Sequence, residues 1–484
     1  MSEAIKNLNP KLVWKYFYQI SKIPHGSGKE AALAEAVCQW AKTAGCPVEK
    51  DKAGNLLIKI PASDGFDSAP SVALQAHLDM VCEKNTETAF NFDTDPLQLR
   101  IVDGWVMATD TTLGADNGIG LAMGLALMED TSFPHGPLEL LCTLDEETGL
   151  NGALNLAPNW IKSDIMINTD TEDEGLFIIG CAGGADTDLY LPIERKAFNG
   201  NIFRLSVKGL KGGHSGMEIN QNLGNAIHHL CNAIEGLQLE ADIRLLDIKG
   251  GDKHNAIPRE AEAIIATDAA LPPLALSIKG LEVIMRRCLT PQEQTATLTI
   301  SPAESTLCPM TQTATTKVVQ LLRAIPHGVE TMSIEIPGLV ETSTNLANVR
   351  TLDDQVLILT SSRSSNSELL NGVLSQINAI GQLAGARVDT HTGYPPWEPD
   401  FNSGLIQPAK EAFEMLFHSA PTFTVIHAGL EGGIIKSKYP NLDVISFGPN
   451  IESPHSPSER TEIQSVANIY QFLCTFLKRI QIDA

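Results

Sequence analysis

The sequence predicts an α/β protein in which a three-layer αβα domain with a mostly parallel sheet is interrupted by an inserted α+β domain. Helical stretches and short apolar runs alternate up to about residue 184, and the alternation returns after about residue 400. This pattern is typical of a sheet covered by helices on both faces. At 484 residues the chain is long enough for two or more domains. We expect residues 1–184 and 401–484 to form one discontinuous domain around an insertion at 185–400.

Two amphipathic helices open the chain. Val13, Phe17 and Ile20 recur at helical spacing after Pro10, which suits the first position of a helix. The stretch SGKEAALAEAVCQWAKTAG repeats the pattern with Leu33, Val37 and Trp40, and its final residue, Gly45, is a typical helix stop.

Short apolar runs then predict strands in NLLIKI, SVALQA, LELLCTL and SDIMIN, with the helical stretch GIGLAMGLALMED between them. The insertion has more alternating strands and longer loops, and it is long for one α+β unit, so two sub-lobes remain an alternative. The proline-rich stretch GYPPWEPDFNSG marks the return to the first domain, because prolines bias their neighbours away from helix. Two strands and a closing helix, IQSVANIYQFLCTFLKRI, complete it.

The composition excludes several classes of partner. With 35 Lys and Arg against 58 Asp and Glu, the formal charge is −23, which disfavours nucleic acid and anionic membranes. Charges interrupt the amino-terminal segment, and no long apolar run follows, so we expect neither a secretory signal nor a membrane span. The nine cysteines include no CxxC pair and suit reduced thiols. A cytoplasmic protein is therefore expected.

His77 and Asp79 stand at the end of the strand run SVALQA. In an extended chain these positions share one face, so the Asp79 carboxylate can accept the second N–H of the imidazole and fix its tautomer. A histidine satisfied at a strand end is the alternative for this pair taken alone.

Similar polar clusters follow the other predicted strands. They are Asp116 in TTLGADNGIG, Asp145, Glu146 and Glu147 in CTLDEETG, Asp170 in INTDTEDEG, and His455 in FGPNIESPHSPSER. Taken singly, each acid can equally be a helix cap or lie in a solvated loop. Since the carboxyl ends of parallel strands face one crevice, we expect these side chains to converge.

So many carboxylates in one place repel one another unless cations are bound. Two divalent metal ions would resolve this, and nitrogen and oxygen donors without cysteine suit zinc, with cobalt or manganese as alternatives. Two such ions with an open position are a common hydrolytic arrangement. Of Glu146 and Glu147, one would bind metal and the other act as general base; their spacing leaves open which does which.

These motifs, together with KGLKGGHSG, HNAIPREA and VIHAGLEGG, resemble the aminoacyl-histidine dipeptidases of the bacterial peptidase D type. That group belongs to the co-catalytic zinc exopeptidases, which include carboxypeptidase and aminoacylase relatives. The ordered match spans nearly the whole chain. The resemblance implies a cytosolic metalloprotease that hydrolyses dipeptides with a free amino terminus and prefers Xaa-His, such as β-Ala-His.

The resemblance also implies a role for each residue at the strand ends. Two zinc ions would be held by His77, Asp116, Glu147, Asp170 and His455, with Asp116 bridging them. Asp79 would orient His77, and Glu146 would be the general base. A cis peptide bond is implied between Asp116 and Asn117.

The insertion would be a lid that carries substrate-binding residues. His214 would stabilise the oxyanion, and Asn255 and Arg363 would hold the substrate backbone and carboxylate. Outside the insertion, Gly432 and Gly433 would let the backbone approach the substrate. The resemblance also makes a homodimer through the lid an expectation.

Two other functions remain as alternatives. The same metal site with a different pocket would deacylate N-acyl amino acids, as in aminoacylase relatives. A non-catalytic, metal-retaining binding protein is the second alternative, although the presence of Glu146 beside the metal ligands argues against it.

Overall fold

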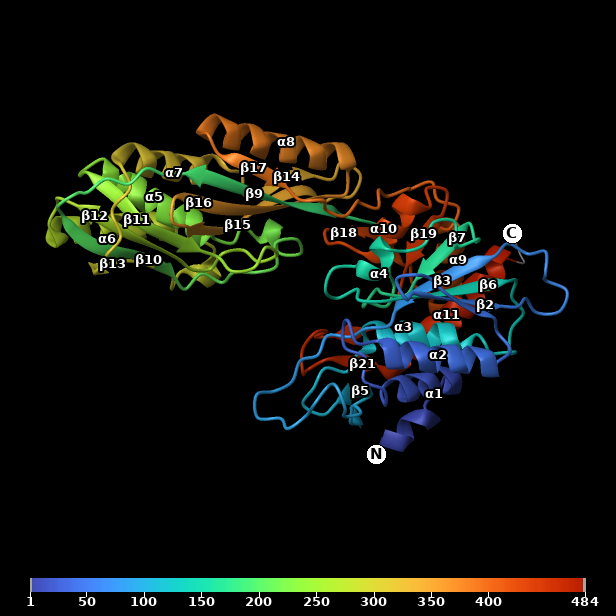
Figure 1. The fold of residues 1–484 in the computed structure, drawn as a ribbon. Helices are drawn as coiled ribbons and strands as arrows, with labels where there is room; N and C mark the ends of the chain where they lie inside the picture. Colours follow the sequence, from blue (N-terminus) through green and yellow to red (C-terminus); the bar gives the residue numbers. More distant parts are fainter. Residues whose placement is uncertain (1, 482–484) are drawn as a thin grey trace. The chain divides into compact units, whose positions relative to one another are not determined.

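The computed structural model describes residues 2–481, which divide into two compact units (Figure 1). The first unit contains the described residues up to Cys181, with Pro399–Val425 and those from Leu430 onward; the second contains Ala182–Glu398 and Ile426–Gly429. The sequence assigned Ile426–Gly429 to the α/β domain. The structure groups this segment with the insertion, and the N–H of Ala182 donates to the carbonyl of Ile426 at 3.0 Å.

The first unit is built on an 8-stranded sheet in the order β1-β2-β6-β3-β7-β19-β8-β18. The central strands β6, β3, β7 and β19 pair in parallel, whereas β1 with β2, β2 with β6 and β19 with β8 pair antiparallel. The strands are β1 (Val48–Lys50), β2 (Leu56–Ile60), β3 (Val72–His77), β6 (Leu138–Thr143), β7 (Ile165–Asn168), β8 (Leu176–Cys181), β18 (Thr422–Ile426) and β19 (Asp443–Ser446). The sheet is therefore less parallel than the sequence predicted.

Helices cover both faces of this sheet (Figure 1). One face packs on η1 (Ser2–Asn7), α1 (Lys11–Ile20), α2 (Ala31–Thr43), α3 (Ala115–Ala126), α9 (Ile406–Phe417) and α11 (Ile463–Gln481). The other is covered by α4 (Asn151–Leu154) and α10 (Glu431–Lys438). Val13, Phe17 and Ile20 are buried in α1, as their spacing predicted. The three-layer fold is confirmed.

A small sheet that the sequence did not reveal joins two distant segments of the first unit. Its strands run in the order β20 (Ile451–Glu452), β21 (Arg460–Glu462), β5 (Trp105–Ala108) and β4 (Leu99–Val102). The residues just before Asp116 are thereby tied to those on both sides of His455.

The second unit contains a 9-stranded antiparallel sheet in the order β13-β10-β12-β11-β15-β16-β9-β17, with β14 paired to β15. Its strands are β9 (Gly183–Pro192), β10 (Asn201–Lys208), β11 (Ile243–Gly250), β12 (Ala261–Thr267), β13 (Thr297–Pro302), β14 (Gly328–Met332), β15 (Val340–Thr351), β16 (Gln355–Ser364) and β17 (Arg387–Thr390). Its helices are η2 (Ile219–Gln221), α5 (Ala226–Gln238), α6 (Leu271–Arg287), η3 (Pro291–Glu293), α7 (Gln312–Ala324) and α8 (Ser367–Ala384).

One hydrophobic core extends along this sheet. Its two halves meet at β11 and β15, where Lys249 pairs with Arg350 and Gly250 with Val349. The sub-lobes that the sequence left open are thus two halves of one continuous sheet. Among residues 2–481, no helix combines the length and apolar character that crossing a membrane requires.

Candidate active site

The carboxyl ends of the central strands bring the predicted polar side chains of the first unit together. His77 is the last residue of β3, Glu146 and Glu147 follow β6, Asp170 follows β7, Asp116 lies at the start of α3, and His455 lies between β20 and β21. Segments far apart in the sequence therefore meet at one edge of the sheet, as expected for parallel strands.

Two groups of three potential metal ligands share Asp116. One is His77, Asp116 and Asp170, and the other is Asp116, Glu147 and His455; within each group the ligand atoms lie within 4.8 Å of one another. Asp116 Oδ1 is 3.1 Å from His77 Nε2, and its Oδ2 is 3.1 Å from His455 Nε2. The two oxygens of one carboxylate thus face two different histidines.

The local backbone geometry places the Asp116 carboxylate between His77 and His455. Asp116 and Asn117 have non-helical dihedral angles although they stand in the first turn of α3, and the peptide bond between them is cis, as the resemblance implies. The Asn117 side-chain amide donates a hydrogen bond to Asp170 Oδ1. Asp116 and Asp170 are therefore linked through Asn117.

The tautomer of His77 follows from its contacts. Its Nδ1 lies 3.0 Å from the backbone carbonyl of Asp79 and 3.3 Å from the carboxylate Oδ1 of the same residue. The sequence predicted the carboxylate as acceptor, whereas the backbone carbonyl is nearer. With the Nδ1 proton held there, the Nε2 lone pair is free to face a metal ion beside Asp116 and Asp170.

The Asp79 carboxylate also holds the turn after β6. It accepts the backbone N–H of Glu146 at 3.0 Å, that of Glu147 at 3.1 Å and the hydroxyl of Ser27 at 2.8 Å. Burial alone would raise its pKa, but the hydrogen bonds and the charge of His77 bring the pKa of Asp79 down to about 2. This buried carboxylate therefore remains charged and orients three site residues.

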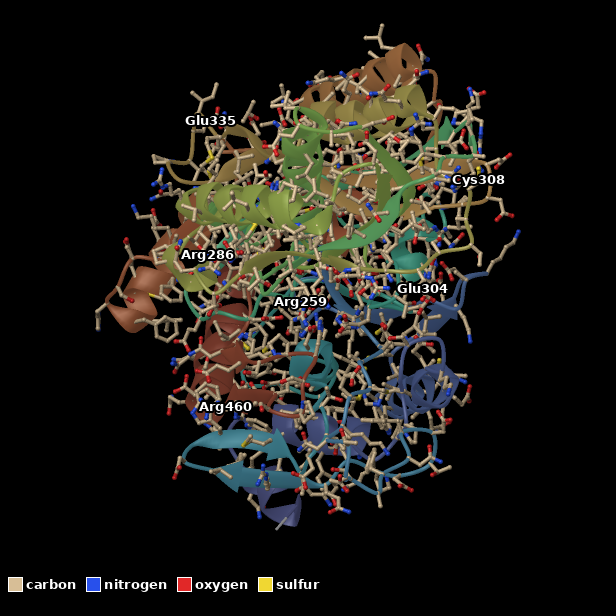
Figure 2. The ribbon with its side chains drawn as sticks, turned by 90° about the vertical axis from the view of Figure 1, so that its left-hand side faces the viewer. Arg259, Arg286, Glu304, Cys308, Glu335 and Arg460 are labelled. Carbon is tan, nitrogen blue, oxygen red and sulfur yellow. The ribbon has the colours of Figure 1, made fainter. Side chains whose placement is uncertain are left out.

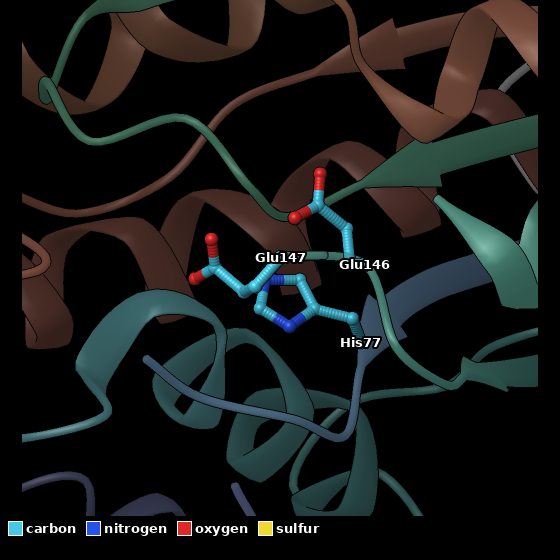
Figure 3. Close-up of side chains that lie close together, drawn as sticks. All are labelled: His77, Glu146 and Glu147. Atoms are coloured by element: carbon cyan, nitrogen blue, oxygen red, sulfur yellow. The ribbon is translucent and has the colours of Figure 1, made fainter. Parts of the chain in front are cut away.

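Glu146 and Glu147 diverge from adjacent positions, with the His77 ring beside both (Figure 3). Glu147 Oε1 lies 3.0 Å from His455 Nε2. The side chain of Glu146 makes no hydrogen bond among the described residues. Burial, followed by the charges of Asp170 and other acids nearby, raises the pKa of Glu146 well above its usual range. Of the two, Glu146 is the carboxylate available to exchange a proton.

The histidines of this cluster show how much negative charge surrounds them. Hydrogen bonds with Asp116 and Glu147 raise the pKa of His455 to about 11. Burial lowers the pKa of His77, yet the surrounding carboxylates raise it well above its usual value. Each imidazole thus sits where a cation is favoured, and nitrogen and oxygen donors without a thiolate fit zinc, cobalt or manganese.

A neighbouring acidic cluster, Glu30, Asp79 and Asp145, stabilises the turn after β6 through hydrogen bonds. Glu30 Oε1 accepts the N–H of Gly28 at 2.8 Å and that of Asp145 at 3.1 Å. Asp145 accepts hydrogen bonds from the side chains of Thr148 and Asn151. These carboxylates are occupied by donors of the protein and fix the DEETG segment.

The motif HAGLEGG contains a buried acid, Glu431, whose importance the sequence reasoning missed. Glu431 is buried in the first unit and accepts from Gln75 Nε2 and Thr143 Oγ1, each at 2.6 Å. Gly432 and Gly433, chosen from the sequence, lie buried in the first turn of α10. A charged residue embedded in an otherwise apolar motif was the available signal for Glu431.

In the second unit, contacts define the tautomer of His214. Its Nδ1 accepts the backbone N–H of Gly216 at 3.2 Å and that of Met217 at 3.0 Å, so the ring proton lies on Nε2. Burial and then the charge of Arg363 lower the pKa of His214. Asn255 is held beside it, because its carbonyl accepts the N–H of Ser215 at 2.9 Å.

Arg363 on β16 is only 7% exposed. Its Nη1 donates to the hydroxyl of Tyr394 at 2.8 Å, while its buried Nε finds no hydrogen-bond acceptor among the described residues. Nearby is His427, also missed from the sequence, whose Nε2 lies 2.7 Å from Ser343 Oγ. Burial and the charge of Arg363 lower the pKa of His427 to about 3. This cluster suits an anionic group.

Comparison with known proteins identifies the family. Residues 73–479 match the peptidase family M20/M25/M40. The cytosol non-specific dipeptidase of Escherichia coli (strain K12) is 42% identical over 483 residues, covering 99% of each chain. The crystal structure of aminoacylhistidine dipeptidase from Vibrio alginolyticus has a TM-score of 0.89 at 38% identity, again covering 99% of each chain.

A more distant structure shows the fold alone. A tripeptidase of Staphylococcus aureus has a TM-score of 0.58 at 16% identity, covering 98% of this chain and 99% of its own. Together these matches confirm the family resemblance and the fold class that the motifs predicted.

Proposed function

The chain belongs to peptidase family M20/M25/M40, and from this premise we propose that it is a two-metal dipeptidase acting on dipeptides with a free amino terminus, Xaa-His dipeptides among them. The observation that carries the proposal is Asp116, whose two oxygens each lie 3.1 Å from the Nε2 of a different histidine. The dipeptidase activities in the names of the E. coli and V. alginolyticus relatives support the substrate class.

Two divalent ions, zinc in this proposal, would be held by the two groups of ligands. His77, Asp116 and Asp170 would hold one ion, and Asp116, Glu147 and His455 would hold the other. When bound, the ions supply a Lewis acid for the scissile carbonyl and make the attacking water more acidic.

Glu146 moves the proton. Its carboxylate takes a proton from the attacking water and then passes it to the nitrogen of the leaving amine. A raised pKa suits this task, because a carboxylate of ordinary pKa is a weak base at neutral pH. Asp79 holds the backbone from which Glu146 and Glu147 diverge, so it keeps the base and the metal ligand in fixed relation.

The second unit recognises the polar groups of the substrate. His214, with its proton on Nε2, donates to the carbonyl oxygen as negative charge develops there. Arg363 binds the terminal carboxylate with its free Nε, and Asn255 holds the substrate backbone. In the first unit, Gly432 and Gly433 let the backbone of the first turn of α10 approach the substrate closely.

Location and assembly complete the proposal. The cytosol is the proposed location, in keeping with the name of the E. coli relative. A homodimer through the second unit is supported by α6, which exposes Leu276 (73%), Val283 (53%) and Ile284 (58%) along one stripe. Sedimentation of the wild type and of Val283→Glu tests this: a dimer that the substitution dissociates is expected, and a monomeric wild type contradicts it.

A substrate panel tests the activity. The full chain is stripped of metal with a chelator, reloaded with Zn²⁺, Co²⁺ or Mn²⁺, and assayed on β-Ala-His, several Xaa-His and Xaa-Ala dipeptides, a tripeptide and N-acetylhistidine. We expect hydrolysis of dipeptides only, restored by metal. Faster cleavage of N-acetylhistidine would favour a deacylase, and two bound ions without turnover of any compound would favour a binding protein.

A further inference from the structure

Glu459 is a buried carboxylate that accepts hydrogen bonds from four successive backbone amides of one distant loop. The N–H groups of Leu113 and Gly114 donate to its Oε2 at 2.7 and 3.1 Å. Those of Ala115 and Asp116 donate to its Oε1 at 2.7 and 3.4 Å. Only 2% of Glu459 is exposed, so these donors replace the water that would otherwise solvate its charge.

The loop 113–116 has the shape of an anion-binding nest. Gly114 adopts a left-handed conformation, with φ +67° and ψ 32°, and directs successive N–H groups to the same side at the start of α3. Such amides, at the positive end of a helix, favour a negative charge. Here the chain itself supplies the acceptor carboxylate, and the final amide of the nest is that of Asp116, which both groups of proposed metal ligands share.

The segment from His455 to Glu459 touches Asp116 at both ends. The His455 ring lies 3.1 Å from the Asp116 carboxylate, and Glu459 accepts the Asp116 N–H. Just beyond, Arg460, labelled in Figure 2, pairs with Glu452 and lies over the ring of Trp105, 4.5 Å from its centroid. The position of the segment is therefore fixed from outside the site.

We propose that Glu459 is a positioning residue of the metal centre, which sets Asp116 relative to His455 by holding the backbone of loop 113–116. Its only contact with a proposed metal ligand among the described residues is with the backbone N–H of Asp116, and it contacts neither a metal-binding atom nor a reacting group. Its effect on catalysis rests on the proposed two-metal function, whereas its effect on metal affinity can be measured without any substrate.

A second buried carboxylate of the same unit provides a matched control. Glu139 on β6 is 5% exposed and accepts the N–H groups of Lys162 and Ser163, each at 2.9 Å, and the Ser163 hydroxyl at 2.7 Å. Replacing either glutamate by glutamine removes an acceptor from backbone amides. Of these two glutamates, only Glu459 accepts a hydrogen bond from the backbone of a proposed metal ligand.

The test titrates metal-free full chain with Co²⁺ by calorimetry and absorption spectroscopy. For Glu459→Gln we expect about tenfold or greater loss of affinity for at least one ion and an altered cobalt spectrum, in line with residues that support metal ligands. With metal reloaded, kcat should fall while KM for the dipeptide stays within about twofold. Glu139→Gln should lower thermal stability and leave affinity, spectrum and kcat unchanged.

Equal affinity in Glu459→Gln and the wild type, or equal losses in both glutamine variants, would overturn the assignment. Should Glu459→Gln not fold, Glu459→Asp decides, because it keeps the charge but shortens the reach. The Co²⁺ affinity of Glu459→Asp should be lower than that of the wild type, and its cobalt spectrum should be altered. Wild-type affinity and a wild-type spectrum in this variant would refute the proposal. If the wild type binds two ions yet cleaves no dipeptide, the proposed function fails while this test stands.

Discussion

His455 of the first unit lies in electrostatic surroundings opposite to those of His427 and His327 of the second unit. In the first unit, hydrogen bonds to Asp116 and Glu147 raise the pKa of His455 to about 11. In the second, burial and neighbouring positive groups lower the pKa of His427 to about 3 and that of His327 to about 3. The imidazole of His455 is surrounded by acids, whereas those of His427 and His327 are surrounded by apolar or cationic groups.

This difference suits the two units to different tasks in the proposed function. Carboxylates that outnumber their donors favour cations, so the first unit is suited to metal ions. Neutral imidazoles beside a buried guanidinium offer hydrogen-bond donors to an anion, so the second unit is suited to the carbonyl oxygen and carboxylate of a substrate. Four predictions test whether this separation holds.

The largest effect is expected for Glu146→Ala. Loss of a general base typically lowers kcat by about 10² to 10⁴. Metal content should stay at the wild-type level, because the two groups that share Asp116 are complete without Glu146, which forms a third group with His77 and Glu147. Glu147→Ala serves as the matched variant and should lose metal. Metal analysis showing that the ions leave with Glu146 as well would make it a ligand and end its role as base.

His214→Ala should have the next largest effect. Removal of one oxyanion donor typically costs about 10² to 10³ in kcat. Metal content should not change, because His214 lies in the second unit. His391→Ala is the control, since the side chain of His391 is 56% exposed and pairs with Asp188. An unaltered kcat in the His214 variant would remove this residue from the reaction.

Arg363→Ala should act on substrate binding. A hydrogen bond to a charged group is worth about 1.5 to 3 kcal/mol, which corresponds to about tenfold to hundredfold in kcat/KM. We expect this loss mainly as a higher KM for dipeptides, with metal affinity unchanged. The control is Arg387→Ala, a side chain that is 62% exposed and stacks on Tyr190. A normal KM would show that another group holds the substrate carboxylate.

The smallest effect concerns the stability of the second unit in acid. Burial lowers the pKa of His228 to about 4 and that of His327 to about 3. Below about pH 6.5 these histidines bind protons in the unfolded chain but stay neutral in the folded one. The free energy of unfolding therefore falls as the pH decreases toward the lowered pKa values. The loss is at most about 1.4 kcal/mol per histidine and pH unit. Calorimetry between pH 7 and 5 should show a shallower dependence in His327→Gln, and an unchanged slope would contradict this origin.

Much of the candidate site was accessible from the sequence. The residues at strand ends, such as His77 and Asp170, interrupt apolar runs with groups that have no place in a core, and parallel strands bring such ends together. Periodicity also located the helix around Val13 and Phe17. In these cases the signal lies within a few neighbouring residues.

Other features were beyond sequence reasoning because they depend on contacts between distant segments. The limited parallel pairing of the sheet, the transfer of Ile426–Gly429 to the second unit and the small sheet that includes β21 follow from strand partners that no local pattern names. His427 lay within a quoted motif, yet only its burial beside Ser343 and Arg363 marks it out.

The sequence by itself determined which side chains can bind metal, because ligand chemistry belongs to the residue type. Only the tertiary structure decided how they are held. Glu459 and Leu113 are separated by 346 positions, and their hydrogen bond joins a side chain to a backbone amide that every residue except proline possesses. A contact of this kind leaves no trace in spacing or composition, since the donor is the same whatever the residue.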